Sequence, residues 1–228
     1  NESSTGVTND VKTIASIAKE FDALILVDSV SGLSSINLPV DEWKLDVVET
    51  ASQKGWMAPP GLAMVSVSQT AWQAHTVAKM PRNYFDFTKA KTFFEKNQTP
   101  WTPAVSIFFA LETACDLILA EGLQNVFDRH AGCAQTARDG AKALGLTPLT
   151  DSQCASNTVT AINAPANLDV AKMQKILREE FQVYLAGGQG KLTGKIFRIG
   201  HLGWVSENDM REVLSALAKA IPMALIQT

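Results

Sequence analysis

One lysine lies in a context that suits covalent chemistry. Lys54 belongs to the segment SQKGWMAPPG at positions 52–61, between a predicted strand and a run of apolar residues and prolines. A primary amine in such surroundings can form a Schiff base with a carbonyl compound, and the Pro-Pro-Gly turn would hold its loop stiff. A lone lysine is usually a solvated surface residue, so this interpretation depends on the neighbouring segments.

An acidic residue follows a predicted strand. Asp28 comes directly after the apolar run 24–27, which is typical of a strand buried on both faces of a parallel sheet. Asp28 would therefore lie at the carboxyl end of that strand, where open α/β sheets bind ligands. The alternative is an aspartate that caps the following turn and has no other role.

A third segment carries a guanidinium group. Strand alternation in IFRIG, positions 196–200, places Phe197 and Ile199 on one face and Arg198 on the other. Arg198 could bind a carboxylate there through two parallel hydrogen bonds, or it could be an exposed residue of an edge strand. His201, which follows, is expected to be structural.

A glycine-rich stretch just before this strand superficially suggests a phosphate loop. Positions 187–195 read GGQGKLTGK, but the spacing does not fit GxxxxGK[ST], and a strand follows instead of a helix. We interpret the stretch as a flexible turn.

The elements that position these residues alternate between strand and helix in the first half of the chain. Apolar spacing predicts a helix over 10–21, with Asp10 as its N-cap. Continuous apolar runs predict buried strands over 24–27, 46–48 and 62–67. This order indicates an α/β fold with a doubly wound, mainly parallel sheet and flanking helices.

The second half changes character after Pro100 and Pro103. A long helical region is predicted over 104–144, with an interruption near residue 121. It is followed by a strand at 158–162, a helix at 169–181, a strand at 196–200 and a helix at 207–221. We therefore expect residues 1–121 to be part of a large domain and residues 122–228 to form a smaller α+β domain.

The composition narrows the classes of function. The 228 residues are 46% apolar and 19% charged, as in an ordinary globular protein. The net charge of −3 gives no basic excess for nucleic acid or an anionic membrane, and the apolar runs are too short for a membrane span. Three cysteines without CxxC spacing indicate reduced thiols in a cytoplasmic protein, and no metal site is expected.

Taken together, these segments resemble the class V (fold type I) pyridoxal-phosphate aminotransferases, in particular the alanine–glyoxylate, serine–glyoxylate and serine–pyruvate group. The matching pieces span essentially the whole chain: NESSTGV at 1–7, VDSV at 27–30, SQK at 52–54, APPG at 58–61, TP at 102–103 and FRIG at 197–200. The resemblance implies that residues 1–121 are the C-terminal part of the cofactor-binding large domain and that residues 122–228 are the small domain.

The resemblance also implies a role for each of the singled-out residues. Lys54 would form an aldimine with pyridoxal 5′-phosphate and then move a proton between the substrate Cα and the cofactor C4′. Asp28 would pair with the pyridine nitrogen and make the ring an electron sink. Ser3 would hydrogen-bond the ring hydroxyl, and Gln53 would contact the phosphate. Arg198 would bind the substrate carboxylate.

One further role is implied across a dimer interface. Thr102, or its neighbours Gln98 and Thr99, would reach the cofactor phosphate of a partner subunit in a homodimer. The apolar stretch 101–109 is consistent with such an interface.

Two parts of the family pattern have no counterpart in this sequence: a glycine-rich phosphate loop and an aromatic residue that stacks on the ring. Trp56 and Trp101 lie in other motifs. We therefore expect either a fragment of a longer aminotransferase or one half of a split enzyme whose N-terminal part a separate chain supplies. In both cases we expect this chain alone to bind the cofactor weakly and to have little activity.

The leading hypothesis is transfer of an amino group from alanine or serine to glyoxylate or pyruvate. The alternatives are another class V enzyme (a cysteine desulfurase, a lyase or a phosphonate-directed aminotransferase) or a non-catalytic subunit of a larger complex. Cys154 lies 44 residues before Arg198 and fits a desulfurase poorly, while a scaffold needs none of Asp28, Lys54 and Arg198. We expect a cytoplasmic protein, although a peroxisomal or mitochondrial address cannot be read from this sequence.

Overall fold

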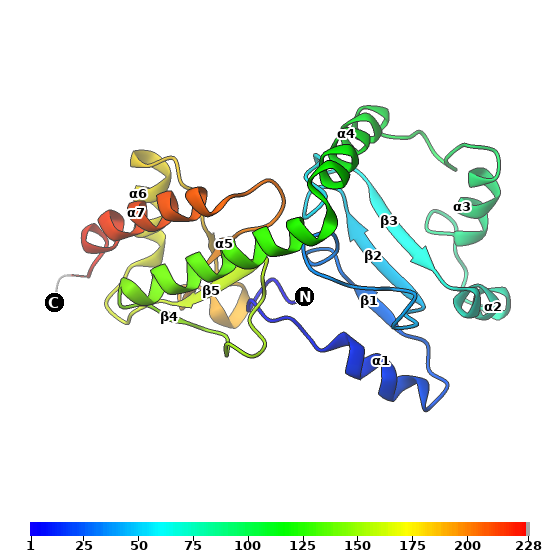
Figure 1. The fold of residues 1–228 in the computed structure, drawn as a ribbon, viewed down its shortest axis with the longest axis horizontal. Coiled ribbons are helices and arrows are strands. Elements are labelled where there is room, and N and C mark those ends of the chain that lie inside the picture. Colours follow the sequence, from blue (N-terminus) through cyan, green and yellow to red (C-terminus); the bar gives the residue numbers. More distant parts are fainter. Residues whose placement is uncertain (227–228) are drawn as a thin grey trace.

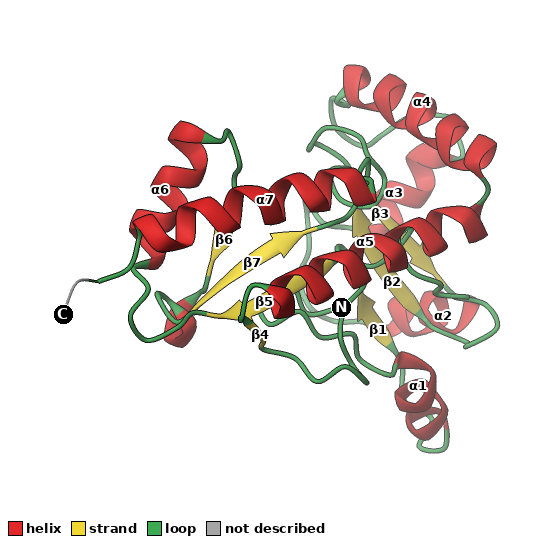
Figure 2. Ribbon diagram, turned by 60° about the vertical axis from the view of Figure 1, so that its left-hand side comes forward, coloured by secondary structure: helices red, strands yellow, loops and turns green. Residues whose placement is uncertain are grey.

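Two β-sheets and the helices around them organise the chain (Figures 1 and 2). The computed structural model describes residues 1–226. In chain order the elements are α1 (Val11–Lys19), β1 (Leu26–Asp28), β2 (Val47–Ala51), β3 (Ala63–Val67), α2 (Gln69–Val77), α3 (Phe87–Phe94), α4 (Val105–Glu121), α5 (Leu123–Ala143), β4 (Thr147–Pro148), β5 (Val159–Asn163), α6 (Val170–Glu180), β6 (Ala186–Gly187), the short 3₁₀ helix η1 (Gly190–Leu192), β7 (Ile196–Gly200) and α7 (Glu207–Met223).

The first sheet has the strand order β1-β2-β3 and contains both kinds of pairing. β1 runs parallel to β2, with Asp28 opposite Glu49, whereas β3 runs antiparallel to β2. The predicted α/β class is confirmed, but the sheet is mixed. The physical reason is that the connection 52–62 between β2 and β3 is a loop that holds no crossover helix, so the chain reverses direction.

The expectation that the apolar run 24–27 is buried on both faces is wrong. Ile25 is buried and packs in a small core with Ala15 of α1 and Val48 of β2, but Leu26 is 69% exposed. β1 is the edge strand of its sheet, and within residues 1–226 its apolar contacts lie on the side that α1 covers. An apolar run therefore marks this strand without showing how many of its faces are covered.

The second sheet is antiparallel, with the order β4-β5-β7-β6. Helices α5, α6 and α7 contribute to the larger hydrophobic core, which contains Phe197 and Ile199 of β7, Leu177 of α6 and Leu217 of α7. The predicted strand 196–200 coincides with β7. Because β7 lies between β5 and β6, the alternative of Arg198 as an edge-strand residue is wrong.

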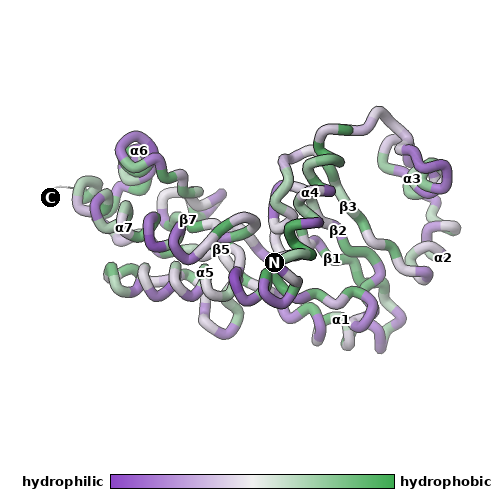
Figure 3. The backbone as a smooth tube through the Cα atoms, turned by 45° about the horizontal axis from the view of Figure 1, so that its top comes forward, coloured by the Kyte–Doolittle hydropathy of each residue, from purple (hydrophilic) through white to green (hydrophobic). Residues whose placement is uncertain are grey.

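Gly122 separates two long helices that lie beside different sheets. Its φ of +85° is a conformation that glycine adopts at little cost, and the predicted interruption near residue 121 is confirmed there. α4 lies beside the first sheet and α5 runs along the second (Figure 1). Much of α4 is hydrophobic (Figure 3), but no described helix has both the length and the apolar content that crossing a membrane requires.

The N-terminal segment connects the two sheets. Val7 forms an isolated bridge with Ala155, just before β5. The Asn1 side-chain amide donates to Thr158 Oγ1 at 2.7 Å and to Ser31 Oγ at 2.9 Å. Thr158 precedes β5 and Ser31 follows β1, so one side chain joins the loops of both sheets.

Two short helices, α2 and α3, are missing from the sequence-based prediction. Both carry N-cap signals, because Ser68 accepts a hydrogen bond from Ala71 N and Asp86 accepts one from Thr88 N. Both helices are short, however, with nine and eight residues, and a segment of that length gives little room for an apolar repeat to show. Strands β4 and β6 are two residues long, which is too short to give a period-2 pattern.

Candidate active site

The loop that carries Lys54 is closed at its base. Lys54 lies three residues after the end of β2. Ser52 Oγ donates to Pro59 O at 2.7 Å and accepts from Leu62 N at 3.2 Å, while Ala58 N donates to Ser52 O at 3.0 Å. These bonds and the two prolines fix the loop, and Lys54 is half-buried within it.

The lysine loop packs directly on the loop that follows Asp28. A Cβ atom added to Gly55 would lie 2.3 Å from Ser35 Oγ and 2.6 Å from Ser34 Oγ, so this contact requires a glycine. Both serine hydroxyls are buried without a hydrogen-bond partner among the residues that the structure describes. Unpaired buried hydroxyls of this kind are commonly satisfied by a bound molecule or by water.

Asp28 ends β1 on the same edge of the sheet. β1 and β2 are parallel neighbours, so Asp28, the last residue of β1, and Lys54, three residues after β2, both lie where the strands have their carboxyl ends. Asp28 Oδ1 accepts a hydrogen bond from Val30 N at 2.9 Å, which is the turn-capping role considered as the alternative. The carboxylate is exposed, and its second oxygen can still accept another donor.

Ser3 and Arg198 are linked to the Asp28 loop by a chain of hydrogen bonds. Ser3 Oγ donates to Ser31 Oγ at 2.7 Å, and Ser31 lies three residues after Asp28. Arg198 Nη1 donates to Ser3 O at 2.8 Å, and Arg198 Nε donates to Gly187 O at 2.9 Å. Two backbone carbonyls therefore fix the plane of the guanidinium group and leave Nη2 and the second N–H of Nη1 for a further acceptor.

Three other predicted residues lie on exposed loops. Gln53 is exposed next to Lys54. Gln98 and Thr102 are exposed between α3 and α4, and Gln98 lines an apolar groove of about 700 Å³ between β3 and α3. No hydrogen bond among residues 1–226 connects Gln98 or Thr102 with the lysine loop, so their phosphate contacts stay predictions that depend on a partner subunit.

A loop that the sequence-based prediction missed also borders the site. Loop 201–206 runs from β7 to α7, and Gly203 in this loop has a φ of +84°. A Cβ atom added there would lie 3.0 Å from the backbone oxygen of Lys54. A glycine shortly after a strand is the one signal that could have pointed to this turn.

His201, at the start of the same loop, is structural, as expected. It is fully buried. Nδ1 lies 3.1 Å from Asn157 O and Nε2 lies 2.8 Å from Thr160 Oγ1. Since the carbonyl oxygen can only accept, Nδ1 carries the proton, and Nε2 accepts from the hydroxyl of Thr160.

This burial makes stability depend on pH. Burial lowers the pKa of His201 to about 4, whereas an unfolded chain would protonate it near 6.5. The unfolded state therefore binds a proton that the folded state does not, and stability is lost as pH falls. We expect this residue to lower the free energy of unfolding by about 3 kcal/mol between pH 6.5 and pH 4.

Urea unfolding of the wild type and of His201→Gln at pH 7.5, 5.5 and 4.5 measures how much His201 contributes to the loss of stability at low pH. The variant should lose less stability on acidification than the wild type does. Parallel pH dependences in the two proteins would show that His201 already takes up its proton in the folded state.

The groups carried by these loops and by β1 fit pyridoxal phosphate in their chemistry. Lys54 offers an amine for the aldehyde, Asp28 a carboxylate for the ring nitrogen, and Ser3 a hydroxyl for the ring oxygen. The unpaired hydroxyls of Ser34 and Ser35 add polar groups beside the lysine loop. The fit rests on the chemistry of these donors and on the contact between the two loops.

The chain matches a described protein family over most of its length. A family model described as "Aminotransferase class-V" matches residues 1–200. The soluble hydrogenase small subunit of a Synechococcus species is 45% identical over 95% of this chain and 56% of its own length. The serine–glyoxylate aminotransferase of Arabidopsis thaliana is 36% identical over 91% of this chain and 53% of its own length.

A solved structure shares the fold. The crystal structure of ureidoglycine–glyoxylate aminotransferase from Bacillus subtilis superimposes with a TM-score of 0.92 at 29% identity, over 98% of this chain and 59% of that chain. The present chain therefore spans a little over half the length of the relatives that it matches.

Proposed function

Since the chain belongs to the class V aminotransferase family, we propose that the protein carrying it transfers an amino group from a small amino acid to glyoxylate or pyruvate. The proposed donor is alanine or serine, and the proposed cofactor is pyridoxal 5′-phosphate. The observation that carries the proposal is the packing of Gly55, next to Lys54, against Ser34 and Ser35 in the loop that follows Asp28. This contact brings the loop that carries Lys54 against the loop that follows Asp28, which supports a shared ligand site for the amine and the carboxylate.

The cofactor, when bound, supplies an aldehyde for amino-group exchange and a protonated ring that withdraws electrons. Lys54 Nζ would hold the cofactor and carry a proton to and from the substrate Cα. Asp28 would keep the ring nitrogen protonated, Ser3 would orient the ring through its hydroxyl, and Gln53 would contact the phosphate. Gln98 and Thr102 are proposed as phosphate contacts across a dimer interface.

Arg198 is the proposed substrate-binding residue. Both the amino acid and the oxo acid carry a carboxylate, and a guanidinium group can bind a carboxylate through two parallel hydrogen bonds. The carbonyls of Ser3 and Gly187 orient Arg198 before substrate arrives. Binding therefore costs little conformational entropy of this side chain.

The names of the relatives support glyoxylate more strongly than any particular donor. One relative is named for serine as the donor and the other for ureidoglycine, whereas both names include glyoxylate. An acceptor that consists of little more than a carboxylate and an aldehyde suits a site in which Arg198 supplies the main recognition. The choice of alanine or serine rests on the sequence resemblance.

A second candidate function is favoured by one observation. The relative that is 45% identical carries the name of a hydrogenase subunit, so the chain could belong to a non-catalytic subunit of a larger complex. Retention of Asp28, Lys54 and Arg198 favours the enzyme, because a scaffold needs none of them. A cysteine desulfurase is disfavoured, because Cys154 lies on the loop beside Asp151 and Thr8 and forms no hydrogen bond with Lys54 or Arg198 among the described residues.

The proposed partners are small amino acids, 2-oxo acids and a second subunit. We propose that the second subunit is another copy of the same protein, which makes a homodimer. Helix α4 supports an additional contact, because it exposes Val105, Phe108, Phe109, Leu117 and Leu119. A helix that exposes this many apolar side chains is normally covered by other protein.

A donor and acceptor screen tests the function and the role of Arg198 together. The protein loaded with pyridoxal phosphate is mixed with alanine, serine or aspartate, and then with glyoxylate, pyruvate or 2-oxoglutarate. We expect alanine or serine to react and glyoxylate or pyruvate to restore the starting spectrum. In Arg198→Lys we expect kcat/KM to fall by about 100-fold for both donor and acceptor, because a charged, paired hydrogen bond is lost.

Two controls separate the possible outcomes. Arg211→Lys changes a more exposed arginine of α7 and should leave kcat/KM unchanged. Ethylamine, which has no carboxylate, should react equally slowly with the wild type and with Arg198→Lys. Cofactor binding without amino transfer from any amino acid would contradict the function, and an unchanged kcat/KM in Arg198→Lys would contradict the role of Arg198.

A further inference from the structure

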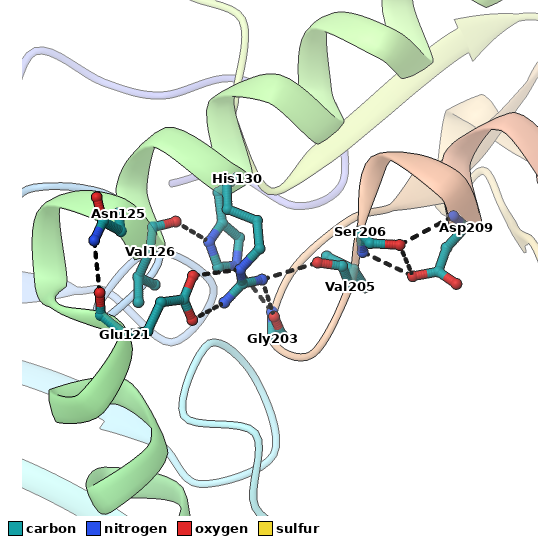
Figure 4. Close-up of polar contacts among 9 residues, drawn as sticks. Glu121, Asn125, Val126, His130, Gly203, Val205, Ser206 and Asp209 are labelled. Carbon is teal, nitrogen blue, oxygen red and sulfur yellow. Dashed lines mark hydrogen bonds and ion pairs between the residues drawn. The ribbon is translucent and has the colours of Figure 1, made fainter.

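The loop that follows the Arg198 strand is held by two adjacent side chains of α5. Arg129 Nη1 donates to Gly203 O at 2.8 Å and to Val205 O at 2.9 Å. His130, the next residue, faces the same glycine from α5 (Figure 4). Loop 201–206 is thus tied to α5 through its own backbone.

The guanidinium group of Arg129 is itself fixed by Glu121, the last residue of α4. Arg129 Nε and Nη2 donate to the two carboxylate oxygens of Glu121 at 2.6 and 2.9 Å. A bidentate pair of this kind sets the plane of the guanidinium group. The remaining nitrogen, Nη1, is therefore aimed at the loop carbonyls.

His130 binds the other side of Gly203. The ring is fully buried, with Nδ1 2.7 Å from Val126 O and Nε2 3.0 Å from Gly203 N. The carbonyl oxygen can only accept and the amide can only donate, so the ring is neutral with its proton on Nδ1. The N–H and the C=O of Gly203 are thus both bound by α5.

Gly203 lies directly against the lysine loop. An added Cβ would be 3.0 Å from the backbone oxygen of Lys54 and 3.6 Å from Met57 Cγ. No side chain separates the two backbones at this point. A displacement of loop 201–206 would therefore change the space available to the Lys54 backbone.

We propose that Arg129 and His130 are positioning residues for Lys54. By holding both polar groups of Gly203, they fix the surface on which the lysine loop rests, and so they fix the position of the Lys54 amine. The same loop begins next to the Arg198 strand, so these two residues couple the carboxylate-binding strand to the lysine. The effect of these two residues on catalysis rests on the proposed function, whereas the contact between the two loops is independent of it.

Competitive labelling of amines tests this proposal in the cofactor-free protein carrying this chain. The protein is treated with a trace of acetic anhydride, and peptide mapping gives the labelling rate of Lys54 relative to exposed Lys191. In Arg129→Ala and in His130→Phe we expect this ratio to change by at least about threefold. His130→Phe keeps a ring of similar size and changes no charge, because His130 is neutral. Arg211→Ala, which removes an arginine paired with Glu207 on α7, should leave the ratio unchanged.

Different results would contradict the positioning role of Arg129 and His130 and the proposed aminotransferase function. An unchanged ratio in folded Arg129→Ala and His130→Phe would overturn the positioning role, whatever their thermal stability. If Arg129→Ala does not fold, Arg129→Lys replaces it, because lysine keeps the charge but cannot form the bidentate pair with Glu121, and the same threefold criterion applies. Failure of the wild type to attach pyridoxal phosphate at Lys54 would contradict the proposed function and leave the labelling result standing.

Discussion

Lys54→Ala is expected to lower transamination by at least about 10³-fold and to remove the visible absorbance that arises when the cofactor is attached to a lysine. Proton transfer by a positioned side chain alone contributes about 10²- to 10⁴-fold, and Lys54 would also supply the covalent attachment. The loop itself should persist, because its closing bonds come from Ser52, Ala58 and Leu62. Absorbance and steady-state rates of the cofactor-loaded protein measure both effects.

Lys191→Ala is the matched control for this variant. Lys191 is an exposed lysine on the 3₁₀ turn η1, so its loss should leave the rate and the spectrum unchanged. A Lys54→Ala protein that retained the visible band and at least a tenth of the rate would show that another amine does this chemistry.

Asp28→Asn is expected to weaken cofactor binding and to lower the rate of the amino-acid half-reaction, per bound cofactor, by about 100-fold. The amide has nearly the shape of the carboxylate but not its charge, so it no longer favours a protonated ring nitrogen, and the ring withdraws electrons less strongly. Removal of the substrate Cα proton should then be slower. A larger primary isotope effect with substrate deuterated at Cα would locate the loss at that step.

Two further variants define the role of the charge at position 28. Asp28→Glu keeps the charge and should recover part of the lost rate. Asp22→Asn removes a carboxylate from an exposed turn before β1 and should change nothing. Equal rates in the wild type and Asp28→Asn would mean that this carboxylate serves only the turn, through its bond with Val30 N.

Much of the fold can be predicted because its elements have strong local patterns. The strand 196–200 coincides with β7, and the break between α4 and α5 lies at Gly122, close to the predicted interruption near 121. The antiparallel direction of β3 could have been inferred from the short connection 52–62. The exposure of Leu26 could not, because it depends on which other elements cover the strand.

The site is predictable to the extent that its residues lie in motifs. Asp28 is predictable because it directly follows an apolar run, and Lys54 because it lies between a predicted strand and an apolar, proline-containing segment. The structure brings their loops into contact through Gly55. The contact of Gly203 with Lys54 joins residues 149 positions apart, and no local pattern encodes it. The roles of Arg129 and His130 cannot be predicted from the sequence for the same reason. An arginine and a histidine on a helix form no sequence motif that would indicate their contact with a distant loop.

The central claim is that the amine at position 54 and the carboxylate at position 28 bind one pyridoxal ring. The most direct test is borohydride reduction of the cofactor-loaded wild-type protein, followed by peptide mapping. We expect a pyridoxyl group on the peptide that contains Lys54, and a yield that falls in Asp28→Asn. A label on a different lysine, or no label in a protein that still transaminates, would contradict the account.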